Sequence, residues 1–117
     1  MYEIYKLPQG KIVFSCTTKD LNTGALYLNS HQALPKHKRP VAEQLVQVVG
    51  TCVMKLFDGD TLVNEVTLNE NDTLTIPANQ FHMHINPTND ISVTMWKFEG
   101  DISEIIQKIR EENKKIL

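Results

Sequence analysis

The sequence predicts an all-β fold, a sandwich or closed barrel, with one α-helix at the C-terminus. Between about residues 11 and 98, short strand-like runs alternate with turn signals at the close spacing typical of such folds. Two polar segments in this region, beginning at His37 and at Ile76, carry imidazole and carboxylate groups at strand spacing. After residue 100 the apolar residues recur at helical spacing instead.

Length and composition predict one domain over residues 1–117. The chain is 41% hydrophobic and 22% charged, which is ordinary for a soluble globular domain. Its net charge of −2 favours no nucleic-acid surface, and no apolar run is long enough to span a membrane. The N-terminus lacks a signal-peptide pattern, and Cys16 and Cys52 form neither a C-x-x-C pair nor a zinc ribbon. We therefore expect a cytoplasmic protein with no nucleic-acid or membrane partner.

The predicted strands follow one another in eight short runs. They cover residues 11–18, 25–29, 43–49, 52–57, 61–68, 73–76, 80–86 and 91–98. Asp58-Gly59-Asp60 predicts a tight hairpin, because an Asp-Gly pair readily supplies positive φ angles. Polar turns at residues 69–72 and 87–90 separate the later runs.

The C-terminal helix is expected over about residues 101–116. Asp101 is the predicted N-cap, and Glu104 lies three positions on, as in a capping box. One face carries the apolar residues Ile102, Ile105, Ile106, Ile109 and Ile116, and the other face is charged. This pattern predicts an amphipathic helix packed on the outside of the β body.

The second polar segment places two imidazoles on one face of a strand. Residues two apart in a strand point to the same side, so His82, His84 and Asn86 share a face. We expect this face to line the barrel interior, with Met83 and Ile85 covered from outside.

The first polar segment places a carboxylate at the start of a strand. Glu43 and Gln47 share a face of the run 43–49, and a buried glutamate needs a cation, a donor or a metal as its partner. His37 and Arg39 lie in the loop just before this strand. Gln47, Arg39 and His84 are the expected ligand-binding residues.

These two segments resemble the two signature motifs of the cupin superfamily. The first motif runs H-x-H, three or four residues, E, six residues, G. His37, Glu43 and Gly50 match it, but Arg39 stands at the second histidine position.

The second motif runs G, five residues, P-x-G, two residues, H, three residues, N. Pro77, His82 and Asn86 match it, and Asn71 and Asn79 replace the two glycines. Because asparagine tolerates positive φ better than most residues, we expect these turns to persist.

The resemblance implies a double-stranded β-helix, or jelly-roll barrel. Cupins often bind a divalent metal through three histidines and one glutamate, and His37, Glu43 and His82 match ligand positions. His84, on the same strand face as His82, could serve as a spare ligand. Arg39 cannot ligate a cation, because its guanidinium stays protonated and has no acceptor.

Two hypotheses for the pocket remain open at this point. In one, His37, Glu43 and His82 hold Fe, Mn, Ni or Zn, and Arg39 points aside or holds an anionic group of the substrate. In the other, Arg39 pairs with Glu43, its charge replaces that of the metal, and the pocket binds an organic ligand or nothing. The direction of the Arg39 side chain decides between them.

Three functions follow from the resemblance. The first is a metal-dependent oxygenase or isomerase acting on a small molecule. The second is a metal-free sugar-nucleotide isomerase or epimerase, and the third is a non-enzymatic ligand-binding or regulatory cupin. For all three, the apolar outward positions Val46, Val48, Met83 and Ile85 predict a homodimer.

Overall fold

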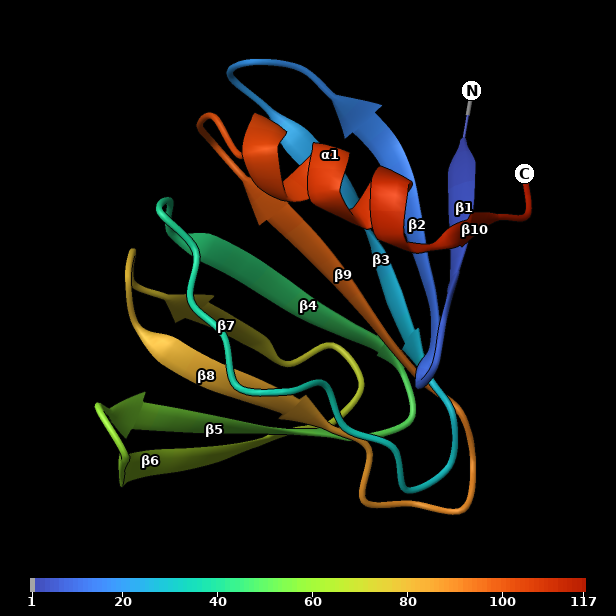
Figure 1. The fold of residues 1–117 in the computed structure, drawn as a ribbon. Helices are drawn as coiled ribbons and strands as arrows, with labels where there is room; N and C mark the ends of the chain where they lie inside the picture. The colour runs from blue at the N-terminus through green and yellow to red at the C-terminus, as the bar shows by residue number, and fades with distance from the viewer. Residues whose placement is uncertain (1) are drawn as a thin grey trace.

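The computed structural model describes residues 2–117 and contains two β-sheets and one helix (Figure 1). The larger sheet has the strand order β10-β1-β2-β3-β9-β4-β7, and the smaller has the order β6-β5-β8. The strands are β1 (Glu3–Leu7), β2 (Gly10–Thr17), β3 (Asn22–Leu28), β4 (Glu43–Val49), β5 (Cys52–Asp58), β6 (Thr61–Leu68), β7 (Thr73–Ile76), β8 (Phe81–Ile85), β9 (Ser92–Phe98) and β10 (Lys114–Lys115). The helix α1 spans Ser103–Glu112. The predicted all-β fold with one C-terminal helix is thus confirmed.

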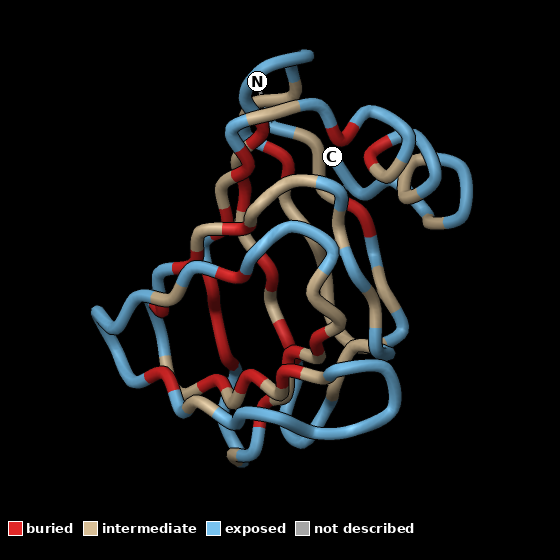
Figure 2. The backbone as a smooth tube through the Cα atoms, turned by 90° about the vertical axis from the view of Figure 1, so that its left-hand side faces the viewer, coloured by how far each residue is buried: buried red, intermediate tan, exposed pale blue. Residues whose placement is uncertain are grey.

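Burial alternates along the inner strands with the period of two that the sequence predicts (Figure 2). On β4, Glu43, Leu45 and Gln47 are buried, whereas Val46 between them is 41% exposed. On β8, both His82 and His84 are buried. The expected inward faces of both motif strands are therefore confirmed.

The motif turns survive the replacement of glycine by asparagine. Asn71 has φ 75° and Asn79 has φ 64°, both in the left-handed region that glycine usually occupies. The backbone N–H of Asn79 donates to the carbonyl of Arg39 at 2.7 Å. The Asn79 turn thereby ties the second motif to the loop of the first.

The chain ends differ from the sequence-based expectation. The larger sheet begins at Glu3 rather than at about residue 11, because β1 pairs with both β2 and β10. The helix is shorter than expected: Ile102 rather than Asp101 is its N-cap, and Asn113 ends it with extended backbone. Asp101 still contributes, since its Oδ1 accepts a hydrogen bond from the Ser103 N–H at 2.9 Å.

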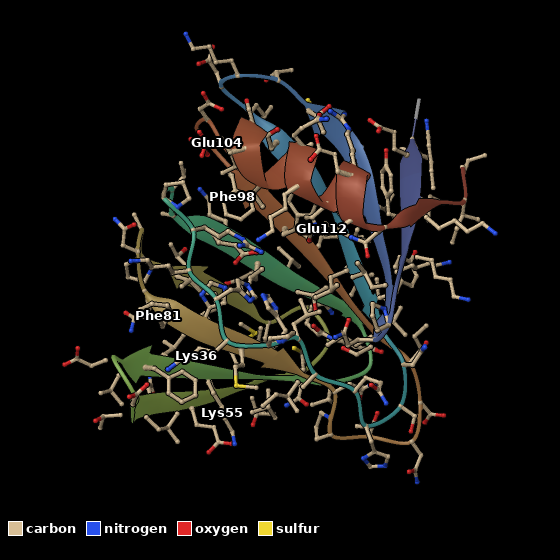
Figure 3. The ribbon with its side chains drawn as sticks, viewed as in Figure 1. Lys36, Lys55, Phe81, Phe98, Glu104 and Glu112 are labelled. Atoms are coloured by element: carbon tan, nitrogen blue, oxygen red, sulfur yellow. The ribbon has the colours of Figure 1, made fainter. Side chains whose placement is uncertain are left out.

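The helix covers the inner face of the larger sheet, not the outside of the barrel. Ile102 and Ile106 are buried in the same core as Phe14, Trp96 and Phe98, whose side chains lie on that inner face. In Figure 3, Phe98 lies beside α1. The smaller sheet and α1 therefore cover different parts of one sheet face (Figure 1). Within the described residues, no helix is long and apolar enough to cross a membrane.

One ion pair joins α1 to the first strand. Arg110 donates from Nε to Glu3 Oε1 at 3.0 Å and from Nη2 to Glu3 Oε2 at 2.7 Å. Nη2 also donates to Thr17 Oγ1 at 3.2 Å, and the Tyr5 hydroxyl donates to Glu3 Oε1 at 2.8 Å. The hydrogen bonds from Arg110 are the main reason that the pKa of Glu3 is lowered.

We predict that Glu3→Gln lowers the free energy of unfolding by about 1 kcal/mol at pH 7, since a part-buried bidentate pair is lost. A carboxylate with a lowered pKa in the folded state stabilises the protein above the usual glutamate pKa of about 4.3. This contribution is lost as the pH falls through the folded-state pKa. Urea unfolding of both proteins from pH 7 to pH 3 should show the difference vanish in acid.

The exposed Glu112, the last residue of α1, serves as the control. Glu112→Gln should change the free energy of unfolding by less than about 0.5 kcal/mol at any of these pH values. A loss for Glu3→Gln that is equal at pH 7 and pH 3 would contradict the ion-pair account.

Candidate metal site

Backbone pairing brings His37 to His82. The segment around residue 37 forms an isolated antiparallel bridge with β8. The His37 N–H donates to the His82 carbonyl at 3.0 Å, and the His82 N–H donates to the His37 carbonyl at 2.8 Å. The two imidazole rings consequently lie edge to face, with their centroids 4.3 Å apart.

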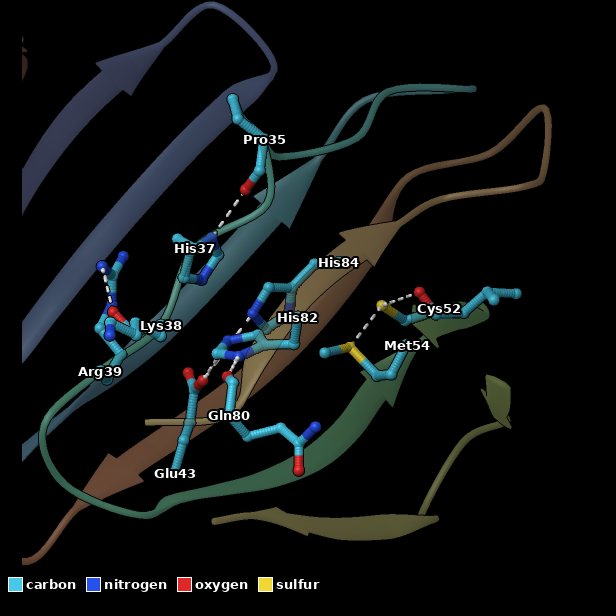
Figure 4. Close-up of polar contacts among 11 residues, drawn as sticks. Pro35, His37, Lys38, Arg39, Glu43, Cys52, Met54, Gln80, His82 and His84 are labelled. Carbon is cyan, nitrogen blue, oxygen red and sulfur yellow. Dashed lines mark hydrogen bonds and ion pairs between the residues drawn. The ribbon is translucent and has the colours of Figure 1, made fainter. Parts of the chain in front are cut away.

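Three imidazoles lie close together, and one carboxylate approaches two of them (Figure 4). One candidate ligand atom each from His37, His82 and His84 lies within 4.8 Å of the others. Glu43 reaches them from β4 in the other sheet, with Oε1 3.1 Å from His82 Nε2 and 3.9 Å from His84 Nε2. The site therefore draws side chains from both sheets and from the loop before β4.

Backbone carbonyls set the tautomers of two of the imidazoles. His37 Nδ1 lies 2.8 Å from the Pro35 carbonyl, and His82 Nδ1 lies 2.8 Å from the Gln80 carbonyl. Because a carbonyl only accepts, each Nδ1 carries a proton, and in the neutral ring the Nε2 keeps a free lone pair. This is the arrangement by which proteins orient histidine ligands of metals.

Buried polar atoms of the cluster lack hydrogen-bond partners. Glu43 Oε1, His82 Nε2 and His84 Nδ1 are all inaccessible to solvent and without a partner among the described residues. Leaving such atoms unpaired is costly, and a carboxylate oxygen facing an imidazole lone pair is repulsive unless a cation lies between them. The donor set thus fits a bound metal ion.

Two of the imidazoles, those of His37 and His84, are held in the neutral form that binds metals. Burial, followed by the charge of Arg39 and by His82, lowers the pKa of His37 to about 3. Burial is also the main reason that the pKa of His84 lies well below its usual value, with His37 the next cause. At neutral pH both rings therefore offer a lone pair without first losing a proton.

Arg39 lines the same cavity as His37, Glu43 and His84. The hypothesis of a direct Arg39–Glu43 pair is not supported, because no ion pair within 4 Å joins them in residues 2–117. The Glu43 carboxylate lies against the imidazoles instead. Arg39 Nη1 makes one long hydrogen bond, 3.4 Å, to the Lys38 carbonyl, and burial lowers the pKa of the guanidinium.

The cavity has a polar end and an apolar end. It measures about 50 Å³, and His37, Arg39, Glu43 and His84 form its polar end. The rest of its lining is apolar and comes from strands β2, β3 and β9, from α1 and its N-cap Ile102, and from Leu34 in the loop before β4. The contribution of the helix to the cavity could not be predicted from the sequence, because its isoleucine stripe is equally typical of a helix on an outer face.

Gln47 is not brought to the cavity. It is fully buried, and its Nε2 donates to the Val49 carbonyl at 2.9 Å and to Ser92 Oγ at 3.0 Å. Its Oε1 accepts from Thr94 Oγ1 at 2.6 Å. With its amide group satisfied by neighbouring strands, Gln47 cross-links the sheet rather than contacting a ligand.

His84 lies in the same cluster as the two histidines of the cupin motifs. It was expected as a spare ligand, and one of its ring nitrogens lies within 4.8 Å of a candidate ligand atom of both His37 and His82. Arg39 holds the second histidine position of the first motif, and His84 supplies a third imidazole from the second motif instead. Its place on the same strand face as His82 was the signal for this.

The sequence matches no protein-family profile and no curated protein, but the fold is similar to solved structures. An oxalate oxidase matches with a TM-score of 0.64 at 15% identity, over 69% of this chain and 42% of that one. A variant of Bacillus subtilis oxalate decarboxylase matches with a TM-score of 0.72 at 17% identity, over 81% and 27%. A cupin superfamily protein from Desulfitobacterium hafniense matches with a TM-score of 0.62 at 12% identity, over 74% and 72%.

The chain has the cupin fold. It spans less than half the length of the two oxalate enzymes, and identities this low show the fold alone. The cupin resemblance of the two motif segments is therefore confirmed at the level of fold, and their histidines converge as that resemblance implies.

We predict that Gln47→Leu lowers the free energy of unfolding by about 2 kcal/mol, because Ser92, Thr94 and the Val49 carbonyl lose a buried partner. The matched control is Gln44→Leu, on the outward face of the same strand, with an expected change below about 0.5 kcal/mol. Urea unfolding measures both. An equal effect of the two substitutions would contradict the structural role of Gln47.

Proposed function

We propose that the protein binds one divalent transition metal ion through His37, Glu43, His82 and His84, and that a small molecule binds beside the ion. The observation that carries the proposal is the proximity of Glu43 to His82 and His84 in a cluster whose buried atoms have no hydrogen-bond partner among the described residues. Fe, Mn, Ni and Zn all accept imidazole and carboxylate ligands.

The proposed chemistry is that of a metal-dependent oxygenase or isomerase. Four protein ligands leave positions open for substrate or water on an ion that prefers six, and a metal so bound supplies Lewis-acid or redox chemistry. Glu43 and the three histidines hold the ion, and the carbonyls of Pro35 and Gln80 orient two of the rings. Solved enzymes of the same fold, such as the oxalate oxidase, support an enzymatic role.

The cavity size does not favour the sugar-nucleotide alternative. A volume of about 50 Å³ holds a few water-sized groups, whereas pockets for drug-sized ligands measure roughly 300–1,000 Å³. A ligand of few atoms therefore suits the site better.

A homodimer and a cytoplasmic location stay predictions. The outer face of the larger sheet supports a homodimer, since Val46 is 41% exposed and its cross-strand neighbour Met95 is 52% exposed. Covering such a face by twofold pairing is common. Size-exclusion chromatography with light scattering decides the oligomeric state.

The metal proposal is tested by elemental analysis of untagged protein, purified without chelator and then reloaded with each of the four metals. We expect about one ion per chain for at least one metal. His82→Ala and His84→Ala should each weaken binding of that metal by at least about tenfold, since each removes one ligand. Thermal unfolding of the metal-free variants confirms that they fold.

The control is His31→Asn, at an exposed histidine outside the cluster. Asparagine suits its positive φ of 57°, so the fold should be undisturbed and metal uptake unchanged. Wild-type protein that retains none of the four metals would overturn the proposal, and unchanged uptake in His84→Ala would remove His84 from the ligand set.

A further inference from the structure

We propose that the small molecule is an organic carboxylate with a short apolar tail, whose carboxylate Arg39 binds beside the metal. The inference rests on the proposed function, because the metal ion supplies positive charge to the pocket in addition to that of Arg39. It names the class of ligand that the cavity takes, which the metal site alone does not specify.

The first argument is charge. Among the described residues, Glu43 is the one acidic side chain that lines the cavity. Its carboxylate lies close to His82 and His84. A divalent ion together with the Arg39 guanidinium therefore leaves an excess of positive charge in a largely apolar cavity. Uncompensated buried charge is costly, and an anionic ligand removes that cost.

The second argument is unused donors. A guanidinium has five N–H donors in a planar fork that fits a carboxylate. Arg39 uses one of them, in a 3.4 Å bond to the Lys38 carbonyl. Trp96 adds another buried donor on the cavity wall, because its Nε1 has no partner in residues 2–117.

The third argument is the shape and lining of the cavity. Beyond its polar end, the wall is formed by apolar side chains, including Ile105, Ile106 and Ile109 of α1 and Ile102 at its N-cap. Its volume of about 50 Å³ limits the tail to a few carbon atoms. Such walls solvate a planar monoanion with a hydrocarbon tail better than a multiply charged phosphate.

The single tryptophan of the chain provides a direct probe. Zinc-loaded, ¹⁵N-labelled protein is titrated with propionate, with its neutral isostere propionamide and with inorganic phosphate, and the Trp96 indole N–H signal is followed by NMR. We expect a saturable shift with propionate, and binding at least about tenfold weaker for the other two compounds. Equal binding of propionamide would overturn the proposal.

Arg39→Gln is the decisive variant, and Lys38→Gln, at the exposed cation next to it, is the matched control. Arg39→Gln should take up zinc normally and bind propionate at least about tenfold more weakly, whereas Lys38→Gln should resemble the wild type in both. Wild-type propionate affinity in Arg39→Gln would overturn the proposal.

The two proposals fail separately. Normal zinc uptake with no propionate response would leave the metal site standing and overturn the carboxylate site. If the protein takes up no metal, the metal-free protein is titrated in the same way. If propionate then shifts the Trp96 signal of the metal-free protein, and Arg39→Gln removes the shift, the carboxylate site is supported. If propionate causes no such shift, the carboxylate proposal is overturned together with the metal proposal.

Discussion

The reciprocal pair of backbone hydrogen bonds between His37 and His82 is the contact on which the site depends. It lays a loop, which has no regular secondary structure of its own, against β8 in a fixed register. The Asn79 N–H bond to the Arg39 carbonyl holds the next part of that loop. With both contacts in place, His37 faces the two imidazoles of β8, and Glu43 enters from the opposite sheet. A shift of one residue would turn these side chains away.

Much of this arrangement follows from local rules that the sequence displays. Strand alternation correctly placed Glu43 inward on β4 and both histidines inward on β8, because a buried face tolerates no slip of register. The asparagines at the two glycine positions adopt the positive φ expected of them. These features depend on the residue and its near neighbours, so one sequence is enough to predict them.

Other features depend on contacts between distant segments, which local patterns do not encode. The pairing of β1 with β10 joins the two ends of the chain, and the isoleucine stripe of α1 specifies an apolar partner without saying which face of the sheet provides it. Gln47 was expected to contact a ligand, yet Ser92 and Thr94 occupy its amide group. Likewise, Arg39 shares a cavity with Glu43 without pairing with it, because the imidazoles already lie against that carboxylate.

The central claim is that three imidazoles and one carboxylate together hold one metal ion. X-ray absorption at the edge of the bound metal tests this most directly, because imidazole rings give distinctive multiple scattering. For the zinc-loaded protein, the account predicts a shell of nitrogen and oxygen ligands at about 2.0–2.2 Å and scattering from three imidazoles. A spectrum with one imidazole or none, or with sulfur ligands at about 2.3 Å, would contradict it.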